Sequence, residues 1–229
     1  MFVSIPERRR PRRTWVTPAL VALCVLAFVW LSLLPPELRA PAVSRWGTVP
    51  ETLLAARSDW VAAILEGRVL TLLTSLFIHA DWLHLLGNAL FLVIFGMAAE
   101  RALGGFRFLL LFLAGGAVAN LAAALSLDQP ASVIVGSSGA VSAVIGAYLA
   151  LFPRARLGLV LPLGLFLEFV RMPASLLIAI WALLQLAFSF VGPAFGAVAW
   201  WAHLTGFAGG VVFALLARRA VARRLRQRG

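Results

Sequence analysis

Charge is what this sequence has least of. Only 13% of its 229 residues are charged, nine of them are acidic, and no lysine is present, so all twenty basic residues are arginines. Hydrophobic residues make up 62% of the chain, whereas soluble domains are about half apolar and about a quarter charged. The composition excludes an ordinary soluble domain and predicts a polytopic membrane protein.

The net charge of +11 does not indicate a nucleic-acid-binding protein. Most of the arginines lie in short clusters beside hydrophobic runs, a pattern that sets membrane topology and attracts anionic lipid headgroups. We therefore expect the lipid bilayer as a partner and no nucleic acid.

Cysteine is also nearly absent. The single Cys24 excludes a disulfide framework, and its place in an apolar run is typical of an inert packing residue. This run follows an arginine-rich N-terminus and superficially resembles a signal peptide. At about 20 residues it is long enough to span a bilayer, whereas a signal core has about 7–15. No small-residue cleavage site follows it, so we interpret it as a retained first helix.

Hydrophobic runs predict six membrane-spanning helices, at about residues 15–34, 82–99, 106–125, 138–152, 174–191 and 200–216. The apolar segment 153–173 carries three prolines and several charges, so we expect a folded connection there rather than a crossing. The predicted fold class is an all-α polytopic bundle. One membrane domain, 15–217, with a long interfacial first loop at 35–78, lies between basic segments at 1–14 and 218–229.

The distribution of arginines predicts the orientation of these helices. With six crossings, both termini share one side with the connections after the second and fourth spans. That side holds sixteen of the twenty arginines, and the other side holds only Arg39, Arg45, Arg57 and Arg68. Because arginine-rich segments stay in the cytoplasm, we expect a plasma (inner) membrane protein with both termini cytoplasmic.

A few strongly polar side chains interrupt the apolar spans. The three histidines, His79, His84 and His203, lie in or at the mouth of predicted spans on the extracytoplasmic side, as does Asn88. Polar groups inside a span are costly and are functional candidates by default, although a single one often only bonds a neighbouring helix. His84 and Asn88 are four residues apart, so their side chains lie on one helix face.

The stretch VIVGSSGAVSAVIG adds a candidate nucleophile. Ser138 lies where a loop turns into a helix, between Gly136 and Gly139, which permit a sharp turn and a close backbone approach. The start of the helix adds free N–H groups and the positive end of the helix dipole. The competing interpretation is close helix packing, which we expect for Ser142 and Gly146 on one face of this helix.

Together these side chains are the components of an acyl-transfer site. Ser138 is expected to attack a peptide carbonyl, and His203 to accept its proton and later protonate the leaving amine. His84, Asn88 and the Ser138 backbone N–H are expected to hold the oxyanion. Beyond His203, two glycines spaced four apart permit close packing against another helix.

The motifs HADWLHLLGN, GSSG and AHLTG, in this order, resemble those of the rhomboid intramembrane serine proteases. That family has an H-x4-H-x3-N helix, a G-x-S-G nucleophile motif and an A-H-x2-G helix. The resemblance implies roles for nine residues when it is carried over position by position. They are Ser138 as nucleophile, His203 as its base, His84 and Asn88 as the oxyanion site, and His79, Gly136, Gly139, Gly206 and Gly210 as supporting residues.

The resemblance covers residues 15–217 and implies a six-transmembrane-helix rhomboid-like bundle with a Ser-His dyad. It also implies a water-filled cavity open to the extracytoplasmic side, a lipid-embedded first loop, and a mobile fifth helix and cap loop near 193–199. The implied substrates are single-span or polytopic membrane proteins, cleaved without a metal or cofactor. Ser137, at the variable position of G-x-S-G, is expected to cap the helix. The sequence leaves the natural substrate and the oligomeric state undefined.

Two positions depart from the family pattern. Members often have Trp-Arg in the first loop where this chain has Leu70 and Thr71, and some stack a tyrosine on the catalytic histidine where it has Ser142. The second departure leaves open what orients His203. One alternative is an inactive relative that binds membrane proteins, but both reacting residues are present. The other is a small transporter, against which we expect no acid within a span and no repeat.

Overall fold

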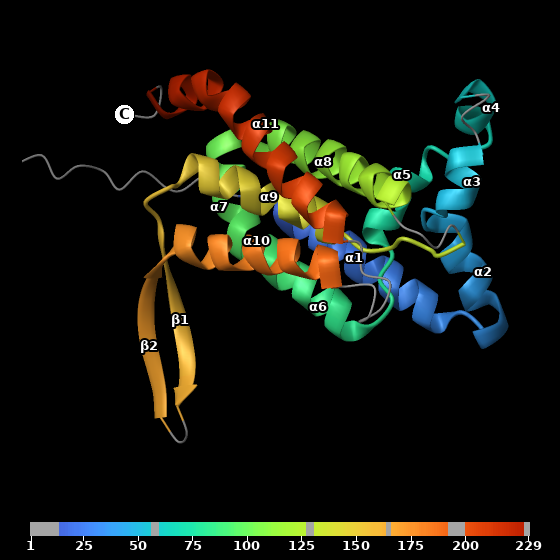
Figure 1. Cartoon of the computed structure of the whole chain (residues 1–229), viewed down its shortest axis with the longest axis horizontal. Helices are drawn as coiled ribbons and strands as arrows, with labels where there is room; N and C mark the ends of the chain where they lie inside the picture. Colours follow the sequence, from blue (N-terminus) through green and yellow to red (C-terminus); the bar gives the residue numbers. More distant parts are fainter. Residues whose placement is uncertain (1–13, 56–59, 127–130, 164–165, 192–199, 227–229) are drawn as a thin grey trace, which may run out of the picture.

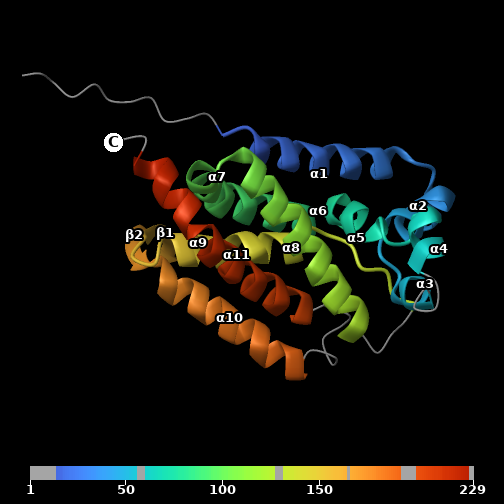
Figure 2. The same cartoon turned by 90° about the horizontal axis from the view of Figure 1, so that it is seen from above.

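The computed structural model describes residues 14–55, 60–126, 131–163, 166–191 and 200–226. Six apolar helical segments form a bundle (Figures 1 and 2). They are α1 (Val16–Leu33), the continuous segment α6–η3–α7 (Trp82–Phe91, Leu92–Gly96 and Met97–Leu103), α8 (Gly105–Ser126), α9 (Ser138–Leu151), α10 (Ala174–Val191) and α11 (Trp200–Arg226).

Among the described residues, four segments are long and apolar enough to cross a membrane: α1, α6–η3–α7, α8 and the first part of α11. The stretches Ser138–Leu151 and Ala174–Phe190 are shorter apolar helices. The prediction of an all-α polytopic membrane protein is therefore confirmed. The final helix continues to Arg226, well beyond the expected span end at residue 216, so the basic segment is helical in its described part.

Helix α7 also extends beyond its predicted span and carries a buried acid into the bundle. Glu100 is 3% exposed and accepts hydrogen bonds from the backbone N–H groups of Trp15, Val16 and Thr17 at 2.9–3.0 Å. The Thr17 hydroxyl donates a fourth bond at 2.8 Å. The expectation of no acid within a span is wrong at this position. The carboxylate is accommodated because the first N–H groups of a helix have no partner inside that helix.

Helix α9 lies at the centre of the bundle, with α1 and α10 on opposite sides of it (Figure 2). Every residue from Gly139 to Tyr148 is buried. Helix α11 packs on α9 almost backbone to backbone, because a Cβ atom on Gly206 or Gly210 would overlap the carbonyl oxygen of Gly139 or Ala143. The small residues of these two helices therefore serve close packing, as expected for the G-x3-G pair.

The long first connection consists of short helical pieces. They are α2 (Pro36–Trp46), α3 (Pro50–Leu54), α4 (Trp60–Leu65), α5 (Thr71–Thr74) and the 3₁₀ turn η2 (Ser75–Phe77). The Thr48 hydroxyl donates either to the Thr71 carbonyl at 2.9 Å or to the Ser75 hydroxyl at 3.1 Å. On α8, the Asn120 amide donates to Ser75 at 2.8 Å and to the Leu72 carbonyl at 3.1 Å. Buried polar contacts thus attach this connection to the bundle.

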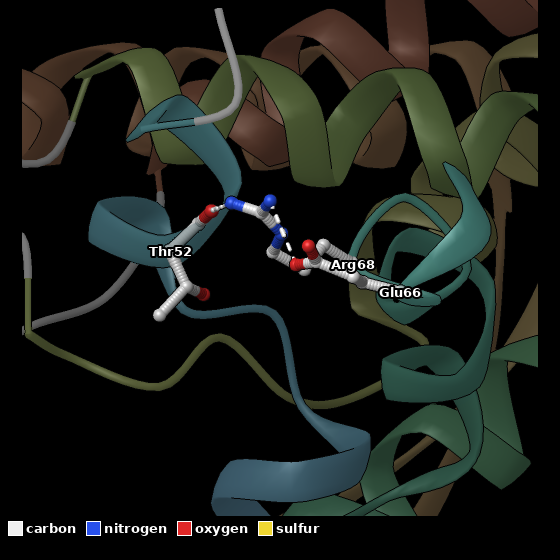
Figure 3. A network of polar contacts seen from close by, with 3 residues as sticks. All are labelled: Thr52, Glu66 and Arg68. Atoms are coloured by element: carbon white, nitrogen blue, oxygen red, sulfur yellow. Dashed lines mark hydrogen bonds and ion pairs between the residues drawn. The ribbon is translucent and has the colours of Figure 1, made fainter. Parts of the chain in front are cut away.

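A second polar contact links α3 to the turn after α4 (Figure 3). The Arg68 guanidinium donates to the Thr52 carbonyl at 3.2 Å and pairs with the Glu66 carboxylate at 2.8 Å. The Glu66 side chain is 60% exposed, so this ion pair contributes little to stability.

The folded connection expected at residues 153–173 is a β-hairpin. Strands β1 (Arg156–Leu163) and β2 (Phe166–Pro173) pair antiparallel, from Arg156 opposite Pro173 to Leu163 opposite Phe166. The hairpin projects away from the helices (Figure 1). Both strands of a two-stranded sheet are edge strands, which tolerate a proline such as Pro162. The hairpin, the start of α1 and the end of α11 lie at one end of the bundle, and α2 to α5 lie at the other (Figure 1).

Candidate active site

The entry into α9 fixes the position of the candidate nucleophile. Thr48 and Ile134 form a β-bridge, and the Gly136 N–H donates to the Ser75 carbonyl at 2.9 Å, so the segment before α9 is tied to the first connection. Gly136 has a φ of +106°, and a Cβ there would lie 2.5 Å from two atoms of the His84 ring. Only glycine satisfies both conditions. Ser138 follows as the first residue of α9.

The hydroxyl of Ser138 points at the imidazole of His203. Its Oγ lies 2.9 Å from His203 Nε2, although the two residues are 65 positions apart in the sequence. His203 lies in the first turn of α11, beside the glycine contact between α11 and α9. The close helix packing therefore brings the two side chains within hydrogen-bond distance.

The second ring nitrogen of His203 also has a partner. Gln185 of α10 is 8% exposed, and its Oε1 lies 2.6 Å from His203 Nδ1. The Trp200 ring meets the imidazole edge to face, at 6.1 Å between centroids. Sequence reasoning missed Gln185. The available signal was a lone amide in an apolar helix, at a place where a polar side chain needs a partner.

His84 and Asn88 line the same cavity as the Ser138–His203 pair. The cavity has a volume of about 250 Å³ and is lined by residues of α6, α9, α10 and α11. Asn88 is 9% exposed, and its Nδ2 has no hydrogen-bond partner among the described residues, so this donor is available to a bound group. The Asp81 carboxylate caps α6 by accepting from the His84 N–H at 2.8 Å. Asp81 therefore serves the helix and not His203.

His79 lies behind the cavity rather than in its lining. The ring is 2% exposed, packs edge to face on His84 at 5.1 Å, and its Nδ1 lies 3.2 Å from the Phe77 carbonyl. Burial and the neighbouring His84 lower the pKa of His79 from 6.5 to about 4, so the ring is neutral at physiological pH. Because Nδ1 donates to the carbonyl, Nε2 is free to accept from the Ser137 hydroxyl at 3.3 Å.

Ser137 itself does not act as expected. It occupies the N-cap position of α9, but its side chain makes no capping hydrogen bond and faces His79 instead. The expected capping role is wrong, because the Ser137 hydroxyl bonds the buried His79 nitrogen instead of an N–H group of the first turn. Gly139 and the predicted packing residue Gly146 both contact neighbouring helices. A Cβ on Gly139 would lie 2.6 Å from the Ala119 Cβ of α8, and one on Gly146 would overlap the Phe207 carbonyl of α11.

The described residues contain no group of three or more His, Cys, Asp or Glu side chains that could hold a metal ion. The expected cap loop near 193–199 lies outside the described residues. The cavity thus offers a hydroxyl, an imidazole with both nitrogens engaged, and further N–H donors.

Comparison with known proteins identifies the family of this chain. The Rhomboid domain family matches residues 66–220, which is more than half of the chain. The chain belongs to the rhomboid family, whose members are generally intramembrane serine proteases, although some are inactive.

Individual relatives agree with this family. The putative rhomboid protease YdcA of Bacillus subtilis is 34% identical over 87 residues, which cover 38% of this chain and 43% of that protein. The rhomboid protease GluP of Bacillus subtilis is 36% identical over 102 residues, 44% of this chain and 20% of that protein. The chloroplastic Rhomboid-like protein 11 of Arabidopsis thaliana is 47% identical over 68 residues, 30% of this chain and 24% of that protein. The matches thus span less than half the length of these relatives.

Proposed function

We propose that this chain is an intramembrane serine endopeptidase that cleaves membrane proteins with a Ser-His dyad. The observation that carries the proposal is the 2.9 Å contact between Ser138 Oγ and His203 Nε2 at a cavity inside a membrane bundle. A hydroxyl is a weak nucleophile until a base removes its proton. The contact supplies such a base at hydrogen-bond distance.

The reaction proceeds in two halves. Ser138 Oγ attacks the carbonyl carbon of the scissile bond while its proton passes to His203 Nε2, and the oxyanion is held by N–H donors of His84, Asn88 and the Ser138 backbone. The C–N bond then breaks, and His203 gives the proton to the leaving amine, which leaves an acyl-enzyme. Water, deprotonated by His203, attacks the ester carbonyl. The bond between that carbon and Ser138 Oγ then breaks, His203 returns the proton to Oγ, and the acid leaves. Each oxyanion donor contributes on the order of 10²–10³ in rate.

The remaining site residues have supporting roles in this proposal. His79 holds the His84 ring from behind, and Gly136 and Gly139 allow the sharp entry into α9. Gly206 and Gly210 keep His203 close to Ser138. The substrates are single-span or polytopic membrane proteins with a helix-destabilising segment, because an extended strand must reach Ser138 inside the cavity. The protein lies in the plasma (inner) membrane with both termini cytoplasmic and the cavity open to the extracytoplasmic side.

Two other functions are less well supported. An inactive family member that only binds membrane proteins has no need of a serine and a histidine in hydrogen-bond contact. A transporter needs ionisable groups along a path through the bilayer, but the carboxylate of Glu100 is occupied by the start of α1.

A fluorophosphonate probe tests the nucleophile. We expect the probe to label wild type but not Ser138→Ala. Ser137→Ala is the control and should still be labelled, because the hydroxyl that it removes faces His79 and not His203. His203→Ala is expected to lose at least the roughly 10²–10⁴-fold contribution of a general base, measured as cleavage of a model single-span substrate in proteoliposomes.

Labelling of Ser138→Ala would contradict the nucleophile assignment. Folded wild type that takes up no probe and cuts no co-expressed single-span protein would favour the inactive binder. Thermal unfolding in detergent shows that each variant is folded.

A further inference from the structure

Gln185 is an unusual residue for its place in the fold. Helix α10 is mostly apolar, and the neighbours Leu183, Leu184 and Leu186 are 65%, 49% and 41% exposed. Gln185 alone among these four is buried, at 8% exposure. A buried amide within a membrane-spanning helix is costly unless it is hydrogen-bonded. Its Oε1 finds that partner in His203 Nδ1, at 2.6 Å.

This contact determines which nitrogen of His203 carries the proton. An amide oxygen can only accept a hydrogen bond, so His203 Nδ1 must be the N–H donor. A neutral imidazole carries one proton, and Nε2 therefore keeps its lone pair. That lone pair faces the Ser138 hydroxyl at 2.9 Å. The opposite tautomer would present an N–H to the serine and could not accept its proton.

Gln185 also fixes where the ring lies, since the side chains that could do so instead are engaged elsewhere. Ser142, one turn after the nucleophile, donates to the Ser138 carbonyl at 2.7 Å. Asp81 caps α6. The ring of His203 is thus held by Gln185 at one nitrogen, Ser138 at the other and Trp200 at its edge.

We propose that Gln185 is a positioning residue that holds His203 in the tautomer and orientation needed for a general base. The role resembles that of a carboxylate in a catalytic triad, but it is filled by a neutral amide. A neutral partner fits a site among apolar residues, where an additional buried charge would be costly. The expected effect on kcat rests on the proposed function. The expected tautomer of His203 does not, because it is a property of the unreacted protein.

The test compares two substitutions of Gln185 with one control on the same helix. Gln185→Met keeps the size of the side chain and removes the acceptor, whereas Gln185→Glu keeps an acceptor oxygen in place. Ser189→Ala removes a hydroxyl that donates to the Leu186 carbonyl within α10. We expect Gln185→Met to lower kcat by roughly 10- to 100-fold, the range for loss of a partner that orients a metal-bound histidine. Gln185→Glu is expected to retain more of kcat than Gln185→Met, because its carboxyl oxygen still accepts from His203 Nδ1. KM in each variant and the kcat of Ser189→Ala are expected to stay close to wild type.

A spectroscopic measurement decides the question without any cleavage. In the full chain labelled with ¹⁵N-histidine, we expect the proton of His203 on Nδ1, with its resonances identified by their absence in His203→Ala. A mixture of tautomers is expected in Gln185→Met. Wild-type His203 protonated on Nε2, or Gln185→Met with wild-type kcat per probe-titrated site, would overturn the proposal. Wild type that neither labels nor cuts contradicts the proposed function alone, and the tautomer still tests the role of Gln185.

Discussion

At the scale of single residues, the segment Gly136–Ser138 shows how neighbours with similar chemistry acquire different tasks. Successive residues entering a helix are rotated by about 100°, so the two serine hydroxyls point in different directions. Ser137 faces His79, and Ser138 faces His203. Gly136 carries no side chain, and the His84 ring fills that space.

Gly136→Ala is therefore expected to impair the site more than the fold. The new methyl group meets the His84 ring, and the positive φ adds strain of about 1–3 kcal/mol. We expect a loss of activity on the order of 100-fold, because displacement of a reacting group by about 1 Å has effects of that size. Substrate cleavage and the thermal unfolding midpoint measure the two effects.

Gly67→Ala is the matched control for this substitution. Gly67 also has a positive φ, +74°, but a Cβ there meets nothing within 4 Å. It should show the backbone strain without the loss of activity. Equal activity loss in both variants would show that His84 is not the group affected.

At the scale of elements, the contact between α9 and α11 determines the distance from the nucleophile to its base. Gly210 packs against the Ala143 carbonyl, whereas the adjacent Gly209 is exposed and meets nothing within 4 Å. The two glycines are neighbours on one helix and differ only in what they face. They offer a direct test of the close packing.

Gly210→Ala is expected to destabilise the protein by about 1–3 kcal/mol, the usual cost of overpacking. It should also reduce activity, since α11 must move away from α9 and takes His203 with it. Gly209→Ala should be neutral or should stabilise by up to about 1 kcal/mol, because alanine restricts the unfolded chain. Denaturation in detergent measures both, and equal destabilisation by the two substitutions would contradict this account of the packing.

The elements also show how much could be predicted from sequence. Helices α6, α9 and α10 begin at the expected residues, Trp82, Ser138 and Ala174, because apolar runs and helix breakers are local signals. The roles of Glu100 and Gln185 were not predicted. Each side chain bonds a group on a different helix, Glu100 the start of α1 and Gln185 the His203 ring. Such partners follow from which helices pack together. The site motifs indicated which side chains belong together, but hydrogen-bond geometry exists only in the fold.

At the scale of the whole molecule, the described chain begins and ends at the same end of the bundle (Figure 1). The arginine distribution predicts that this end is cytoplasmic. Glu51 in α3 and Arg219 in α11 are both exposed. Helix α3 and the end of α11 lie toward opposite ends of the bundle (Figure 1). Single cysteines at these two positions can therefore report the orientation.

We expect a membrane-impermeant maleimide to label Glu51→Cys in intact cells, and Arg219→Cys only after the membrane is opened. The background should carry Cys24→Ala, although the native cysteine is only 3% exposed. The reverse labelling pattern would invert the predicted topology. Reaction of both cysteines in intact cells would contradict the even number of crossings.

The length of α9 sets how deep the serine lies. Its 14 residues make a helix of about 21 Å at 1.5 Å per residue, whereas the hydrocarbon layer is about 30 Å thick. If the last turn of α9 meets one edge of that layer, its first residue lies roughly 10 Å beneath the opposite edge. Ser138 is that first residue. In that placement, water must pass below the level of the lipid headgroups to reach Ser138.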